Sequence, residues 1–230
     1  MKSRSRRLFL ILSAIAILLG GCESTGGGAL FLSSEGHADD VYYAESPPRQ
    51  TPEKELSDCL LRVARQVAMR EGVRVRHVSR PETVAGETYE KKTTELSYEQ
   101  GNAIALLDRM TVLRVESDGT GTRALVRVSG SPRLAATLPS GGSGRPRWVD
   151  DPPKGSRFRS AVGTVSQIGV PADAFQNADT AAIGAIAEEV LSPRREGNAA
   201  VYEGTLRGVF IARRWRDSDG RSYSLAIIPR

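Results

Sequence analysis

The chain has 230 residues, of which 40% are hydrophobic and 26% charged, a balance typical of a folded protein. Its formal net charge of +5 comes largely from the first 21 residues, which hold four basic residues and no acidic one. The rest of the chain carries 28 basic and 27 acidic residues, and this balance gives no field that would steer a polyanion to the surface. We therefore expect no nucleic-acid partner.

The N-terminus has the layout of a secretory signal. Basic residues among the first seven are followed by an apolar run from Leu8 to Leu19. This run is shorter than the roughly 20 residues that a membrane-spanning helix needs. We therefore expect residues 1–21 to be a signal peptide that is removed.

The apolar run ends in Leu19-Gly20-Gly21-Cys22, which resembles the lipobox of bacterial lipoprotein precursors. The resemblance implies that a signal peptidase recognises Leu19, Gly20 and Gly21. It also implies a diacylglyceryl group on the Cys22 sulfur and an N-acyl chain such as palmitate on the new amino terminus. Two or more acyl chains hold a protein firmly on a bilayer, at about 0.8 kcal/mol per buried methylene. An ordinary signal peptide with a chance cysteine is the alternative.

The residue after this cysteine is Glu23, where an Asp often retains lipoproteins at the inner membrane. By resemblance, Glu23 permits transport to the outer membrane. We therefore expect a lipid-anchored protein of the cell outer membrane that faces the periplasm, with exposure at the cell surface left open.

Residues 22–52 are expected to form a lipidated tether. Residues 24–28 are rich in Gly and Ser, and Pro47, Pro48 and Pro52 interrupt any regular structure. The apolar patch at residues 41–43 could dock on a domain or a partner, but the linker interpretation is favoured.

Residues 53–130 are predicted to form an N-terminal domain of the α+β class. It opens with a helix that ends at Gly72 and has an apolar stripe at Leu56, Cys59, Leu60, Val63 and Val67. Within that stripe, Cys59 is expected to be a buried core thiol. The alternation at residues 73–78 predicts a strand, and Asp118-Gly119 predicts the turn of a hairpin. Residues 82–101 are polar and weakly patterned, and are interpreted as a continuation of the strand followed by a mobile loop.

Residues 131–145 are expected to be a linker, and residues 146–230 a C-terminal α+β domain. The second domain is predicted to hold a strand at 161–165 and a helix that begins at Pro171. The apolar face of this helix is expected at Phe175, Ala178, Ala182, Ile186 and Val190. Residues 201–215 are predicted to form one long, interrupted strand with bends or bulges at Gly204 and Gly208, and residues 222–228 the closing strand.

The two domains share a pattern that predicts an internal repeat. Residues 114–119 followed by Leu125 echo residues 214–220 followed by Leu225, with spacing that slips by one residue. Each domain is predicted to be a helix packed on a curved antiparallel sheet. Each is also near the lower size limit for a stable core, so we expect the two to support each other or to form oligomer contacts.

Three stretches of the second domain carry a resemblance to a known family. They are Pro-Arg-Trp-Val at 146–149, Ser-Ala-Val-Gly-Thr at 160–164 before the Ala-rich helix, and residues 214–226. In this order, and with the lipobox, they resemble the LPP-twenty family. Its members are related to a twenty-kilodalton outer-membrane lipoprotein antigen and to flagellar outer-membrane assembly lipoproteins. The chain departs from the family at Arg159 and Ser160, because members often have an aromatic residue before Ala-Val-Gly, whereas Phe158 lies earlier here.

The resemblance implies small dodecin-like α+β domains with no enzymatic activity and a role as assembling components. The sequence agrees with the expected lack of enzymatic activity, because it has none of the motifs of a nucleophile elbow, a phosphate loop or a zinc peptidase. His37 and His77 have no Cys or His neighbour at metal-ligand spacing, so no metal site is expected. The covalent lipid on Cys22 is the one non-protein group expected. Trp148, Trp215 and Tyr223 are candidate interaction residues, although Trp215 is better suited to covering its own core.

The expected function is therefore a non-catalytic role in the outer envelope. Such a lipoprotein would bind protein partners or self-assemble, for example in a flagellar or other envelope complex. Two alternatives stay open. One is a regulatory lipoprotein that activates a peptidoglycan synthase, and the other is a periplasmic ligand-binding module, which would need a deep apolar pocket with convergent polar groups.

Overall fold

The computed structural model describes residues 41–130, 139–141, 144–166 and 171–230, which belong to one compact unit spanning Ser34–Arg230. This part of the chain is α+β, as predicted, with helices packed on three sheets whose strands pair antiparallel except at one edge. The dodecin-like detail stays a prediction. The signal peptide, Cys22 and the tether as far as residue 40 lie outside the described residues.

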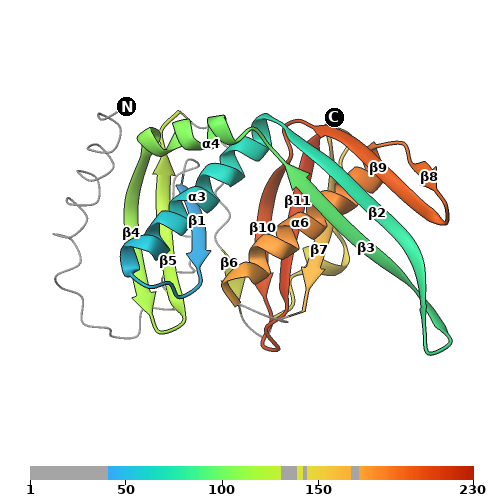
Figure 1. Ribbon diagram of the computed structural model, residues 1–230, viewed down its shortest axis with the longest axis horizontal. Helices are drawn as coiled ribbons and strands as arrows, with labels where there is room; N and C mark the ends of the chain where they lie inside the picture. Colours follow the sequence, from blue (N-terminus) through green and yellow to red (C-terminus); the bar gives the residue numbers. More distant parts are fainter. Residues whose placement is uncertain (1–40, 131–138, 142–143, 167–170) are drawn as a thin grey trace. The chain divides into compact units, whose positions relative to one another are not determined.

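The first sheet has the strand order β1-β5-β4 and packs against helix α3 (Figure 1). Its strands are β1 (Val41–Ser46), β4 (Met110–Asp118) and β5 (Gly121–Val128), and the helix is α3 (Pro52–Glu71). The short helix α4 (Gln100–Leu106) and the 3-10 turn η1 (Leu107–Arg109) lead into β4.

Helix α3 begins and ends where its sequence predicts. The Thr51 hydroxyl accepts a hydrogen bond from the Lys54 backbone N–H, Pro52 occupies the first turn, and Gly72 follows the last. The predicted stripe is buried, apart from a half-buried Leu60. Within it Cys59 is fully buried, with its Sγ 3.5 Å from the Thr122 carbonyl oxygen, so the predicted core thiol is confirmed.

The prediction that residues 22–52 form one tether is wrong at Val41–Ser46. These residues form strand β1, which pairs with β5 from Val41↔Arg127 to Ser46↔Thr122. Tyr43 is only 2% exposed. Apolar and aromatic side chains at residues 41–43 gain more from burial than from solvation, and the Pro47-Pro48 pair ends the strand instead of marking an unstructured segment.

The second sheet has the order β6-β10-β11-β7, with helix α6 on one face and the short helix α5 on the other. The helices are α5 (Arg147–Asp150) and α6 (Pro171–Val190), and the strands are β6 (Pro139–Gly141), β7 (Phe158–Val165), β10 (Phe210–Arg216) and β11 (Ser222–Pro229). The predicted helix at Pro171 is therefore confirmed. Its expected apolar face is buried except at Val190, which is exposed at the end.

Two boundaries of the sequence prediction need correction. The predicted linker 131–145 contains β6, which pairs in parallel with β10, while residues 131–138 and 142–143 of it are not described. The predicted long, interrupted strand 201–215 is two separate strands, and the predicted bend at Gly208 divides them. This glycine has φ +75°, and its N–H donates to the Arg70 carbonyl.

The chain repeats one strand–helix–hairpin plan. In both halves a strand is followed, after five residues, by a proline that begins a 20-residue helix. The β4–β5 and β10–β11 hairpins each have a bulge, which leaves Arg114 opposite Leu125 and Arg213 opposite Leu225. The internal repeat is thus supported, but Arg114 corresponds to Arg213, not Arg214. The one-residue slip arises because eleven residues separate Arg213 from Leu225, whereas ten separate Arg114 from Leu125.

A third sheet joins the two halves. It has the order β3-β2-β9-β8, and its strands are β2 (Val73–Val84), β3 (Glu87–Ser97), β8 (Arg194–Glu196) and β9 (Ala199–Leu206). Strand β2 of the first half pairs with β9 of the second from Val73↔Leu206 to Ser79↔Ala200. The predicted domains 53–130 and 146–230 are therefore recognisable, each as a helix on its own sheet, but they share this third sheet.

Candidate interaction sites

The predicted interaction residues Trp148, Trp215 and Tyr223 are brought together, but they are buried. They are 7%, 3% and 4% exposed, and the rings of Trp215 and Tyr223 lie 5.1 Å apart. The Arg145 guanidinium stacks over the Tyr223 ring and donates to its hydroxyl at 3.1 Å. This cluster covers the face of the second sheet opposite α6, so it is a small core and offers no exposed binding surface. The lipobox residues Leu19, Gly20, Gly21 and Cys22 lie outside the described residues.

A buried ion pair links the second sheet to both long helices. Arg214 on β10 binds both carboxylate oxygens of Asp179 on α6, at 3.0 and 2.7 Å. The Ser224 hydroxyl also donates to Asp179, at 2.6 Å, and Arg214 donates to Gln66 of α3 at 3.1 Å. Burial alone would lower the pKa of Arg214, but the adjacent Asp179 carboxylate more than offsets this and raises it. The pair is therefore charged and saturated with partners.

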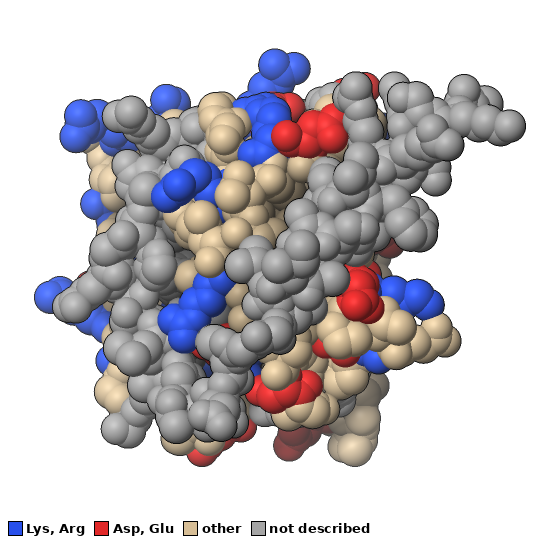
Figure 2. Space-filling model, turned by 90° about the vertical axis from the view of Figure 1, so that its left-hand side faces the viewer, with Lys and Arg blue, Asp and Glu red and all other residues tan. Residues whose placement is uncertain are grey.

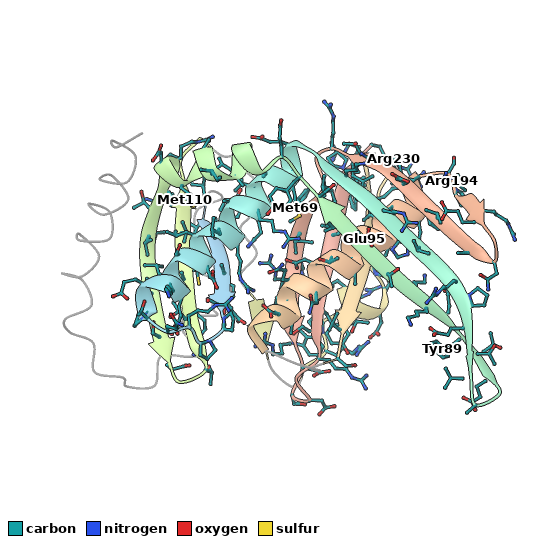
Figure 3. The ribbon with its side chains drawn as sticks, viewed as in Figure 1. Met69, Tyr89, Glu95, Met110, Arg194 and Arg230 are labelled. Carbon is teal, nitrogen blue, oxygen red and sulfur yellow. The ribbon has the colours of Figure 1, made fainter. Side chains whose placement is uncertain are left out.

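The cavity beside this pair is small. It lies among α3, α6, β1 and β10, with Met69 of α3 among its lining residues (Figure 3), and its volume is about 40 Å³. A buried water needs roughly 10–15 Å³ of such space, so the cavity has room for a few waters and not for an organic ligand. The ligand-binding alternative gains no support from it.

A second polar network has the composition of a catalytic triad. The Thr94 hydroxyl lies 2.8 Å from Nδ1 of His77, and Nε2 of His77 lies 2.9 Å from a carboxylate oxygen of Glu188. Because a carboxylate only accepts, Nε2 carries the proton that it donates to Glu188, and Nδ1 pairs with the Thr94 hydroxyl. Triads of a hydroxyl, an imidazole and a carboxylate side chain activate nucleophiles in many hydrolases.

These three residues, however, lie where β2, β3 and α6 pack together, and this contact is structural. The His77 side chain is 3% exposed, and Lys92 Nζ lies 2.8 Å from Glu188. None of the three residues lines the cavity described above. Gly184 lets α6 approach closely, since a Cβ there would lie 2.5 Å from His77 Nδ1. The network therefore fixes the β2–β3 hairpin onto α6.

Beyond this junction the β2–β3 hairpin extends past its neighbours. Strand β9 pairs with β2 only as far as Ser79, whereas β2 and β3 pair with each other out to Val84↔Glu87 (Figure 1). We call residues 80–91 the arm. None of its side chains is buried, and Val84 and Tyr89, the latter labelled in Figure 3, are 54% and 48% exposed.

The turn at the tip of the arm has both central residues in the left-handed region. Ala85 has φ +51° and Gly86 has φ +87°, the signature of a type I′ turn. The sequence interpretation missed this turn because Asn-Gly or Asp-Gly is the usual signal, and Ala-Gly is not. Polar and apolar residues alternate only weakly around this turn, because no hydrophobic core lies beneath the arm. The interpretation of residues 82–101 as a continuation of the strand followed by a mobile loop is therefore right for the end of β2 and wrong for residues 87–97, which form β3.

Charges of both signs are present on the face of the molecule that Figure 2 shows. Figure 2, which views the molecule from the left of Figure 1, shows Lys and Arg side chains interspersed with Asp and Glu. Within the described part of the chain, no three His, Cys, Asp or Glu residues are grouped so that they could hold a metal ion. No helix in the same part has the length and apolarity needed to cross a membrane.

Comparisons with models of protein families, with curated proteins and with solved structures found no match. The resemblance to the LPP-twenty family therefore stays a prediction from the sequence. Among the described residues, the arm is the feature best suited to make a functional contact.

Proposed function

We propose that this chain is a non-catalytic lipoprotein of the outer envelope, of the LPP-twenty type. It is anchored in the outer membrane by a diacylglyceryl group and an N-acyl chain on Cys22 and faces the periplasm. Its role is structural: the folded unit binds protein partners in the assembly of an envelope complex.

The arm is the single observation that carries the interaction role. A two-stranded hairpin is marginally stable by itself, and this one has no buried side chain to stabilise it. Its exposed Tyr89 is of a residue type that is enriched at protein interfaces. Its three glutamates outnumber its two basic residues, Arg80 and Lys91, so its net charge of −1 gives no attraction to an anionic bilayer or a nucleic acid. A protein surface is therefore the best match for the arm.

The polar networks support a non-catalytic role. A catalytic group needs access to a substrate, whereas Arg214, Asp179 and His77 are each less than 6% exposed and are bonded to neighbouring side chains. These networks stabilise the contacts between helices and sheets instead.

The anchor is tested by replacing its cysteine. In intact cells, Cys22→Ala should abolish incorporation of labelled palmitate and release the protein from the membrane fraction. Cys59→Ala is the matched control, because it removes the other cysteine and should leave the labelling intact. Unchanged labelling of Cys22→Ala would refute the lipid anchor.

The interaction role is tested by photo-crosslinking in intact cells. A photoreactive amino acid in place of Tyr89 should form adducts with another polypeptide when illuminated. The same amino acid in place of Ser57, which is exposed on α3, is the control and should give far fewer. Equal labelling at the two positions, or none at Tyr89, would contradict the proposed role of the arm.

A further inference from the structure

The two outer edges of the β2–β3 hairpin offer different backbone groups. Val84 and Glu87 flank a two-residue turn, so they form a hydrogen-bonded pair. From this pair the register runs without a shift to Arg74↔Ser97. Hydrogen-bonded and non-hydrogen-bonded pairs alternate along an antiparallel ladder. The odd-numbered residues of β3 therefore bond to β2, and its even-numbered residues direct their N–H and C=O groups outward.

The outer edge of β2 is closed to a further strand along the arm. The even-numbered residues of β2 bond to β3, and strand β9 covers the other edge as far as Ser79. Beyond that point the outward residues are Pro81 and Thr83. Proline has no N–H, so the edge lacks a donor at Pro81. Proline is one of the devices by which proteins protect an edge strand from further pairing.

The outer edge of β3 has no proline. This strand of 11 residues is the outermost of its sheet (Figure 1). Its outward N–H and C=O groups have no partner among the residues that the structure describes. They belong to Thr88, Glu90, Lys92, Thr94 and Leu96. Such an edge is a template for one more strand.

The lysines of β3 are already paired with carboxylates. Lysine on an edge strand often keeps a second strand away by its charge. Here Lys92 Nζ lies 2.8 Å from a Glu188 oxygen, and Lys91 Nζ lies 2.9 Å from a Glu82 oxygen. Neither lysine therefore presents an uncompensated charge to an incoming strand.

The order of side chains along β3 fits a second copy of the same strand. If two copies pair antiparallel about a two-fold axis at Thr93, Lys91 lies opposite the partner's Glu95, and the reverse pair forms as well. Opposite charges across a ladder are favourable. The Glu95 carboxylate, labelled in Figure 3, has no ion pair with another described residue. The Lys91 side chain is 43% exposed and has three donors, so it can keep Glu82 and gain this second carboxylate.

Other two-fold registers of β3 fit less well. An axis at a charged residue places that residue opposite its own copy, which is unfavourable. The axis at Thr93 overlaps residues 89–97 and brings no like charges together. Axes at Tyr89 or Thr94 also avoid like charges, but they overlap fewer residues. The register about Thr93 is therefore the best match.

We propose that two copies of this chain associate through the outer edges of their β3 strands, antiparallel and centred on Thr93. The inference rests on the proposed function and names the partner that the arm binds. The two third sheets become one continuous sheet, and Tyr89 of the arm lies beside the partner's Ser97. Two copies anchored in one bilayer meet at a raised effective concentration, so a contact of this small size forms there before it forms in dilute solution.

One cysteine tests the contact on the full-length chain in isolated membranes. Thr93→Cys puts a thiol on the axis, opposite its own copy. Thr93 bonds to β2, so it meets its copy in a non-hydrogen-bonded pair, with Cα atoms about 4.5 Å apart. A disulfide spans about 4.4–6.8 Å between Cα atoms, so mild oxidation should give a covalent dimer. Cys59 is fully buried and does not compete.

Three further variants act as controls for this disulfide. Thr83→Cys places the same residue on the edge closed by Pro81 and should give little dimer. In the Thr93→Cys chain, Lys92→Pro removes an outward N–H from each copy, so the yield should fall at least about tenfold. Lys92→Ala removes the same side chain but keeps the N–H, and should retain the dimer.

A change of charge gives a second measurement that leaves the backbone of β3 intact. Glu95→Lys in the Thr93→Cys chain places like charges opposite each other at Lys91. The yield of the dimer should fall, because like charges across a ladder repel.

The outcomes separate this inference from the proposed function. A Thr93→Cys dimer that falls with both Lys92→Pro and Glu95→Lys supports the contact. Equal yields from Thr83→Cys, or an unchanged yield in either of those variants, overturn it. Adducts of Tyr89 with other proteins and no Thr93→Cys dimer overturn this inference and leave the proposed function standing. No adduct and no dimer overturn both.

Discussion

Helix α6 lies very close to its sheet at Gly163 on β7. A Cβ at this position would lie 2.1 Å from the Ala182 backbone nitrogen and 2.3 Å from the Ala178 carbonyl oxygen. Both are backbone atoms of one helix, so they cannot turn aside as a flexible side chain could. The small residues at 178 and 182 have the same cause, because they let the helix lie flat on the strand.

We expect Gly163→Ala to lower the free energy of unfolding by about 3 kcal/mol, since the helix must shift away from the sheet. Gly119→Ala is the control, because a Cβ at Gly119 meets nothing within 4 Å, and it should change stability by less than about 0.5 kcal/mol. Urea denaturation of both variants measures the difference. Equal losses would show that the close approach at Gly163 has no energetic consequence.

The buried thiol of Cys59 makes stability depend on pH in the alkaline range. Burial raises the pKa of this thiol from 9.0 to about 12, so the folded protein holds the proton more tightly than the unfolded chain does. The stabilisation is fully present below pH 9 and is lost as the pH rises toward 12.

Between these values the Cys59 thiol contributes a fall of about 1.4 kcal/mol per pH unit in the free energy of unfolding. Cys59→Ala should show a shallower fall over the same range. A remaining slope is expected, because burial also raises the pKa of Tyr43. Denaturation curves taken at several pH values measure the two slopes, and parallel curves would contradict a buried, protonated thiol.

At the scale of elements, the turn at the tip of the arm can be made more stable by one substitution. Ala85 occupies a left-handed position that costs an alanine about 1 kcal/mol, and Asn-Gly is the favoured pair for this turn. Ala85→Asn should therefore stabilise the arm, whereas Ala85→Val should destabilise it. Hydrogen exchange of the arm amides that pair across the hairpin next to the turn, those of Val84 and Glu87, would show slower exchange in the first variant and faster in the second. The reverse order would rule out the type I′ turn.

The elements that sequence reasoning predicted correctly are those with one buried face. The stripe of α3 and the apolar face of α6 each repeat at helical spacing because one side of the helix meets a sheet. Strand β1 was missed because it is short and lies between a Gly-rich segment and a proline pair. The arm was missed because no core imposes an alternation of apolar and polar residues on it. Its position beyond β9 depends on pairing between residues more than 100 positions apart.

The interaction site was harder to predict than the helices and strands, because it depends even more on how distant parts of the chain pack together. Aromatic residues suggested an interaction surface at Trp148, Trp215 and Tyr223, but the fold stacks them on one another. A shallow surface groove along β8, β9 and the start of β2 combines Arg74 of the first half with Arg194 of the second, and no spacing in the sequence reveals that they are neighbours. Only the pairing of β2 with β9 brings them together.

At the scale of the whole molecule, the shared third sheet ties the halves into one cooperative system. Both tryptophans lie in the second half, so their fluorescence reports on that half, whereas far-ultraviolet circular dichroism reports on both. We expect the two signals to change at one denaturant concentration. Different midpoints would show that the halves unfold as separate domains.

Strand β1 also limits the distance over which the protein can act. If Cys22 bears the lipid, as proposed, the leash to the folded unit ends at Val41 and not at residue 52. A fully stretched chain gains at most about 3.5 Å per residue, so the leash reaches about 65 Å instead of about 105 Å. The first residue of the folded unit therefore stays within that distance of the bilayer in which the lipid is embedded.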